Sequence, residues 1–115
     1  GGTITATGGS YAAGIGGGYA QNGGDHAYGH VICGTITITS GVTRVAATKG
    51  YDSIDSIGRG DKTSATQQCG TITIGCTLDG DGKPVGGTVY WDGSSYKNGG
   101  DTYLKTSPLV YEPQP

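Results

Sequence analysis

The sequence predicts an all-β fold in which short strands from successive repeats stack in parallel. Residues 33–39 read Cys-Gly-Thr-Ile-Thr-Ile-Thr, and residues 69–74 repeat Cys-Gly-Thr-Ile-Thr-Ile. The alternation of Thr and Ile is the period of a half-buried strand, and no segment of this glycine-rich chain carries a helical apolar period. Repeats of about 20–50 residues that are built from short strands are typical of solenoids. We therefore expect a short right-handed parallel β-helix with a C-terminal capping strand or hairpin and essentially no helix.

A second register extends the repeat on both sides of these strands. Residues 4–7 align with residues 45–48, and residues 14–18 then align with residues 56–60. The unit is thus a Thr/Ile strand, a Thr/Val/Ala strand, a Gly-Ile-Gly strand and a loop, with loops expected at 19–32 and 61–68. Ile36 and Ile72 should stack inward while the threonines form an outward ladder.

The repeat pattern also suggests where the units end. We expect β-helix coils over residues 1–76, and a C-terminal cap over 77–103 because a stack of strands must cover its last open edge. Residues 88–91 (Thr-Val-Tyr-Trp) should form a strand of that cap. Prolines at 108, 113 and 115 favour an extended tail or linker over 104–115.

Composition narrows the classes of function. A formal charge of −2 with 14% charged residues offers no basic patch for nucleic acid, and no apolar stretch is long enough to span a membrane. The chain contains no Met, which suggests a mature fragment with neighbouring repeats in a longer parent chain. A surface rich in Thr, Ser, Gly, Asn and Tyr favours an extracellular or cell-surface location.

Cysteines occupy equivalent places in the two copies. Cys33 and Cys69 would lie about 4.8 Å apart as neighbours in a sheet, which is within the separation that disulfides bridge. The alternative is two small residues at a tight corner. Cys76 shares the parity of Ile72 and Ile74, so we expect a buried core thiol.

Two groups of residues are candidates for binding. Tyr90, Trp91, Asp92 and Tyr96 could hold a glycan, because an aromatic ring offers an apolar platform and Asp accepts hydroxyl hydrogen bonds. The alternative is that Tyr90 or Trp91 covers the open end of the stack. Asp79 and Asp81 resemble the start of a calcium loop without its later ligands, and a simple turn is the favoured alternative. No cofactor other than calcium is suggested.

Three further patterns have weaker functional interpretations. Asp25, His26 and His30 could ligate zinc, although solvated polar residues are favoured. Asp52, Asp55 and Asp61, with Arg59 and Lys62, resemble a polysaccharide-lyase cluster, and the threonine ladder resembles an ice-binding face. For both, the favoured interpretation is structural, because outward Thr is a common strand former and no catalytic constellation is complete.

The pattern Cys-Gly-Thr-Ile-Thr-Ile-Thr, with Thr-Ala-Thr at residues 5–7 and Ala-Ala-Gly-Ile-Gly-Gly-Gly at residues 12–18, resembles glycine-rich parallel β-helix repeats of secreted and cell-surface bacterial proteins. The resemblance covers residues 1–74, and it implies an adhesin-like or carbohydrate-binding role. We therefore expect a non-catalytic extracellular module that serves as a stalk or adhesive surface and contacts a glycan or a surface protein. The alternative is a carbohydrate-binding module that uses an aromatic ring near Tyr90–Tyr96.

Overall fold

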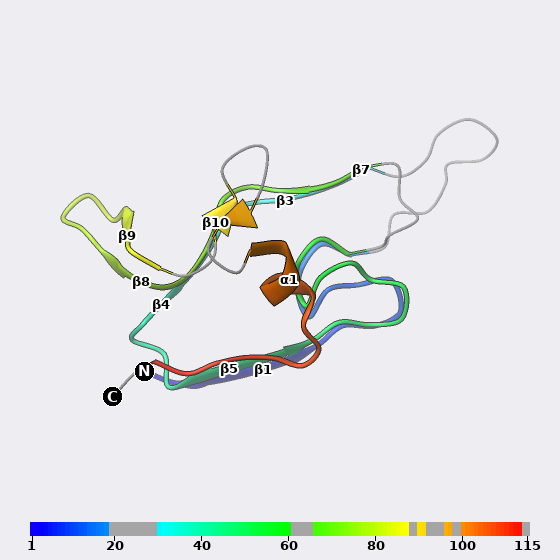
Figure 1. Ribbon diagram of the computed structural model, residues 1–115, viewed down its shortest axis with the longest axis horizontal. Helices are drawn as coiled ribbons and strands as arrows, with labels where there is room; N and C mark the ends of the chain where they lie inside the picture. Colours follow the sequence, from blue (N-terminus) through cyan, green and yellow to red (C-terminus); the bar gives the residue numbers. More distant parts are fainter. Residues whose placement is uncertain (19–29, 61–65, 88–89, 92–95, 98–99, 114–115) are drawn as a thin grey trace.

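The computed structural model describes residues 1–18, 30–60, 66–87, 90–91, 96–97 and 100–113. Strands dominate these residues, and one short helix lies near the C-terminus (Figure 1). The elements in chain order are β1 (Thr3–Thr7), β2 (Ile15–Gly16), β3 (His30–Cys33), β4 (Ile36–Thr39), β5 (Arg44–Thr48), β6 (Ile57–Gly58), β7 (Thr66–Cys69), β8 (Ile72–Leu78), β9 (Pro84–Val85), β10 (Tyr90–Trp91), β11 (Tyr96–Lys97), α1 (Gly100–Lys105) and β12 (Leu109–Tyr111).

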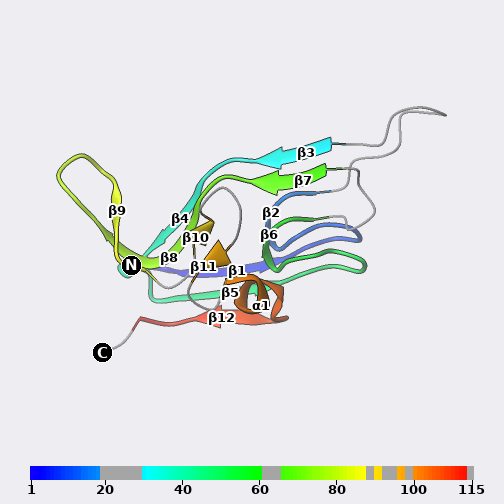
Figure 2. The ribbon, with the colours of Figure 1, turned by 45° about the horizontal axis from the view of Figure 1, so that its top comes forward.

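The two copies of the repeat lie side by side as four parallel pairs. Strands β1, β2, β3 and β4 form a first layer, and each pairs in parallel with its counterpart β5, β6, β7 or β8 in a second layer (Figure 2). The registers are those predicted from the repeats: Ile4 pairs with Val45, Ile15 with Ile57, and Ile36 with Ile72. The predicted parallel stacking of equivalent segments is confirmed, although residues 30–32 and 66–68 belong to strands rather than loops.

The predicted fold class is nevertheless wrong. No sheet in the described residues closes or continues as a solenoid, and the strands form five short separate sheets of mixed direction. Two copies give only two parallel strands in each ladder, whereas solenoids need at least about three repeats for stability. The third strands are antiparallel: β12 adds to β5, and β9 adds to β8. The chain therefore ends its stack after two layers instead of winding onward.

The core lies between the layers and is completed by the C-terminal segment. Its fully buried residues come mainly from the second layer: Val45, Ala47, Ile57, Ile72, Ile74 and Cys76. Leu104 of α1 and Leu109 of β12 are also fully buried and belong to the same cluster. Residues 104–111, within the segment expected to be a tail or linker, thus pack against the body of the protein.

Helix α1 lies over the second layer (Figures 1 and 2). The backbone N–H of Ser56 donates to the carbonyl of Leu104 at 2.7 Å, and its hydroxyl donates to the carbonyl of Thr106 at 2.6 Å. These bonds satisfy the buried polar groups beside β6, where no further strand is paired among the described residues. In that part of the chain, no helix combines the length and apolar character that crossing a membrane requires.

Candidate functional site

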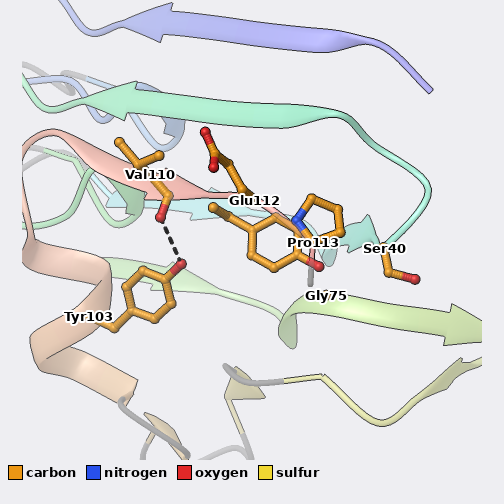
Figure 3. Close-up of a pocket in the computed structure, with 7 residues that line it drawn as sticks. Ser40, Gly75, Tyr103, Val110, Glu112 and Pro113 are labelled. Atoms are coloured by element: carbon orange, nitrogen blue, oxygen red, sulfur yellow. Dashed lines mark hydrogen bonds between the residues drawn. The ribbon is translucent and has the colours of Figure 1, made fainter. Parts of the chain in front are cut away.

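A pocket of about 550 Å³ opens where β12 passes the middle of β8 (Figure 3). Its polar and aromatic lining comes from Ser40, Tyr103, Tyr111 and Glu112, with Gly75, Val110 and Pro113 completing the wall. These residues belong to the turn after β4, to β8, to α1, to β12 and to the two residues that follow β12. The volume lies in the range of about 300–1,000 Å³ that is usual for small-molecule sites.

Strand β12 positions the side chain of Tyr111 in the pocket. Its antiparallel register places Leu109 opposite Ala47 and Tyr111 opposite Val45, on the buried face. The fully buried Leu109 anchors the strand, and Tyr111 continues along the same face to the pocket because side chains alternate along a strand. Glu112 then falls on the other face, where its carboxylate accepts a hydrogen bond from Arg44 Nε at 3.0 Å.

A glycine in β8 makes room for the ring of Tyr111. The register between β4 and β8 shifts after Ile38–Ile74, so Gly75 is an extra residue in β8 and forms a bulge. Its φ is +83°, and a Cβ atom there would lie 2.9 Å from the hydroxyl oxygen of Tyr111. Any other residue at this position would be strained and would press on the ring. The sequence does carry a signal for this site, because Gly75 interrupts the Thr/Ile alternation.

Tyr103, a residue of helix α1, forms the wall of the pocket opposite Tyr111. Its hydroxyl donates a hydrogen bond to the carbonyl of Val110 at 3.3 Å, which ties α1 to β12 (Figure 3). Burial raises the pKa of Tyr103 above its usual value, and the nearby Tyr111 adds to the increase. The Tyr103 phenol is therefore neutral at physiological pH and can offer both a ring face and a polar hydroxyl.

The side chains that line the pocket offer aromatic surfaces and hydroxyl groups to a ligand. Two phenol rings and the Ser40 hydroxyl can contact a ligand, while Arg44 offsets the charge of Glu112. The free Cys76 is buried and its thiol lies 3.9 Å from the carbonyl of Ile38, so it is no exposed nucleophile. In the described part of the chain, no group of three His, Cys, Asp or Glu side chains could hold a metal ion.

The glycan candidates predicted from the sequence lie partly in strands β10 and β11. These strands pair antiparallel, with Trp91 opposite Tyr96 and Tyr90 opposite Lys97. Asp92 lies outside the described residues. A glycan role for Tyr90, Trp91, Asp92 and Tyr96 stays a prediction.

Asp79 and Asp81 lie in the turn that joins β8 to β9. One carboxylate oxygen of Asp79 accepts hydrogen bonds from the backbone N–H groups of Asp81 at 2.8 Å and Lys83 at 2.9 Å. The backbone of Asp79 also bonds to Lys83 and Gly82. This carboxylate stabilises the turn, which is the alternative that the sequence favoured.

The acidic cluster of the second layer is built around one ion pair. Asp55 is fully buried and its carboxylate accepts bonds from Arg59 at the backbone N–H (2.8 Å), at Nε (2.9 Å) and at Nη2 (3.3 Å). Asp61, Lys62, Asp25 and His26 lie outside the described residues. The pair of Asp55 and Arg59 links the two ends of the short segment that contains β6.

The structure also describes the paired cysteines and the threonine ladder that the sequence suggested. Cys33 and Cys69 form a disulfide between β3 and β7, with their Cα atoms 4.4 Å apart. The threonine ladder does not form an open face, because Thr37 is exposed while its neighbour Thr73 is only 4% exposed. Thr73 lies beneath Gly87, where an added Cβ would be 2.6 Å from the threonine methyl.

No family model, no curated protein and no solved structure matches the chain.

Proposed function

We propose that this chain is a non-catalytic extracellular module with an adhesive surface, and that the pocket between Tyr103 and Tyr111 binds a neutral carbohydrate. The observation that carries the proposal is the pairing of two phenol rings with hydroxyl groups in one pocket, with the Glu112 carboxylate held by Arg44 at the rim. Sugars present an apolar ring face bordered by hydroxyl groups, which matches aromatic rings bordered by hydrogen-bonding side chains.

An extracellular location is supported by the disulfide between Cys33 and Cys69. Disulfides persist in oxidising compartments and are rare in the cytosol. The low charged fraction of 14% agrees with a surface built from threonine, glycine and tyrosine. Both features suit a domain that is displayed outside the cell.

The groups in the pocket also indicate the charge of the ligand. Arg44 and Glu112 form an exposed ion pair that is worth about 1 kcal/mol or less, and it leaves the rim close to neutral. The neutral Tyr103 adds no charge. A neutral hexose or short neutral oligosaccharide therefore fits this rim better than a uronic acid does.

Glycan-array screening of the full chain, followed by calorimetric titration of each positive glycan, tests the proposal. Tyr103→Leu removes the ring and the hydroxyl but keeps an apolar side chain, and we expect it to weaken binding by about tenfold or more. Tyr51→Leu is the matched control, because Tyr51 is 70% exposed and does not line the pocket. It should leave affinity unchanged.

Three results would contradict the proposal. An array on which no neutral glycan binds would contradict the proposed ligand, and turnover of a polysaccharide would contradict the proposed non-catalytic role. Binding that survives Tyr103→Leu but is lost on Trp91→Ala would move the site to strands β10 and β11. Circular dichroism of each variant separates loss of binding from loss of fold.

A further inference from the structure

The two layers of the structure bury their inward side chains to very different extents. Ile4 in the first layer is 42% exposed, whereas its paired residue Val45 in the second layer is completely buried. Ile36 is half-buried against a fully buried Ile72, and Ile15 against Ile57 shows the same contrast. Ile4, Ile15 and Ile36 of the first layer are thus less well covered than their partners, although Ile38 of the same layer is buried.

The backbone shows the same asymmetry. The outer side of the second layer is occupied by β12 on β5, by β9 on β8 and by α1 beside β6. Strands β1 to β4 have no second partner strand among the described residues, and they lie along one side of the molecule (Figure 2). We call this side, formed by β1 and its neighbours β2, β3 and β4, the open edge.

Hydrogen bonds at the ends of β1 show which of its groups face outward. The carbonyl of Gly2 accepts from Thr43 N–H, and the N–H of Gly8 donates to the carbonyl of Thr48. In a parallel pair, alternate residues bond to the same neighbour, so the even-numbered residues of β1 bond to β5. The N–H and C=O groups of Thr3, Thr5 and Thr7 therefore point to the open edge.

Two strands of the open edge, β1 and β4, lack the residues that usually keep exposed strands apart. Proteins usually protect such edges with lysine, proline, inward charges or bulges. Strand β1 reads Thr-Ile-Thr-Ala-Thr and β4 reads Ile-Thr-Ile-Thr, without a charge or a proline. An uncharged edge also allows two identical copies to meet about a two-fold axis without repulsion between like charges.

We propose that the open edge binds a second copy of this chain, with β1 pairing antiparallel to β1 of the partner subunit. A two-fold axis at Thr5 makes the two Thr5 residues a hydrogen-bonded pair, which uses the groups that face outward. Ile4 then lies opposite Ala6 of the partner subunit, on the same inward face. Each subunit thereby covers the apolar side chains of the other subunit's first layer. A head-to-tail arrangement is blocked because the opposite side is already covered by β12, α1 and β9.

The test is the mass of the full chain in solution, measured by light scattering after size exclusion and by sedimentation equilibrium over a wide concentration range. The expected species is a dimer with twice the chain mass of 11.5 kDa. Ile4→Lys places two like charges across the two-fold axis, and we expect the dissociation constant to rise on the order of tenfold or more.

Two further variants make the test specific. Val110→Lys is the matched control, because Val110 is 40% exposed but lies on the covered side, and it should leave the dimer intact. Thr5→Pro removes an outward N–H without removing a bond to β5, and it should yield a folded monomer. Circular dichroism confirms that each variant is folded.

A monomeric wild-type chain overturns the proposal. This holds even if a peptide that copies residues 1–9 binds to the chain, because such binding would show that the open edge accepts a strand but not that it joins two copies. A dimer that survives both Ile4→Lys and Thr5→Pro overturns it as well, because the contact would lie elsewhere. The proposed carbohydrate pocket lies on the side of the molecule opposite the open edge. The glycan array therefore tests the proposed function, the mass measurement tests the dimer, and either proposal can fail without the other.

Discussion

Asp55 is the one charged residue that is buried among the described positions. It is completely buried, and Arg59 saturates its carboxylate with three hydrogen bonds. A buried charge is tolerated only where it is paired and hydrogen-bonded. The segment from Asp55 to Arg59, which contains β6, therefore depends on this carboxylate, and the ion pair has a structural role.

We expect Asp55→Asn to lower the free energy of unfolding by about 2–3 kcal/mol, because hydrogen bonds to a charged group are lost inside the protein. Asp79→Asn is the control: its carboxylate also bonds two backbone N–H groups, but in an exposed turn. It should cost about 1 kcal/mol. Urea denaturation followed by circular dichroism measures both, and equal losses would contradict the argument from burial.

The sequence identifies Asp55 as a candidate functional residue, but it does not predict the structural role of this residue. Aspartate and arginine four residues apart fit an ion pair, a lyase cluster or a solvated turn equally well. Burial decides among these, and burial here involves α1, which comes from a distant part of the chain and bonds to the neighbouring Ser56. Gly75 shows the opposite case, since its position in the alternating strand already marks an irregularity.

At the scale of elements, the registers were predictable because the repeats fix them. Identical segments with one offset must pair residue to equivalent residue if they pair at all, and a slip of one residue would turn Ile36 outward. This is why Cys33 meets Cys69 and Ile36 meets Ile72. Antiparallel strands β9 and β12 were not predictable, because neither repeats a segment of the chain.

The disulfide between β3 and β7 closes a loop with a sequence separation of 36 residues. We expect its reduction to lower the free energy of unfolding by about 3–4 kcal/mol, mainly through the entropy of the unfolded chain. Thermal and urea denaturation with and without reductant measure the loss.

The double variant Cys33→Ala/Cys69→Ala is the control for the disulfide. Its stability should match that of the reduced protein and should not respond to reductant. A wild-type chain that is equally stable in both conditions would contradict the expected contribution.

At the scale of the whole molecule, the C-terminal segment decides the architecture. Its prolines and lack of alternation predict a tail, yet Leu104 and Leu109 complete the core. The physical reason is that two layers leave the apolar side of the second one exposed, and a segment with two leucines can cover it. Such coverage is a long-range property that no local pattern records.

The adjacent residues Leu109 and Val110 give a matched test of this coverage. Leu109→Ala should lower the free energy of unfolding by about 3 kcal/mol, because a fully buried side chain is truncated. Val110→Ala, at a position that is 40% exposed, should cost about 1 kcal/mol or less. Chemical denaturation compares them, and similar losses would indicate that residues 104–111 do not hold the core together.

The bulge at Gly75 has a consequence for how such a protein can diversify. The second copy of the Thr/Ile segment contains one residue that has no equivalent in the first, and Tyr111 occupies the space which that residue opens. The two copies supply a regular scaffold, whereas the space for the Tyr111 ring lies where the second copy departs from the first. Additional units of the regular kind would lengthen the stack of strands without reproducing this space.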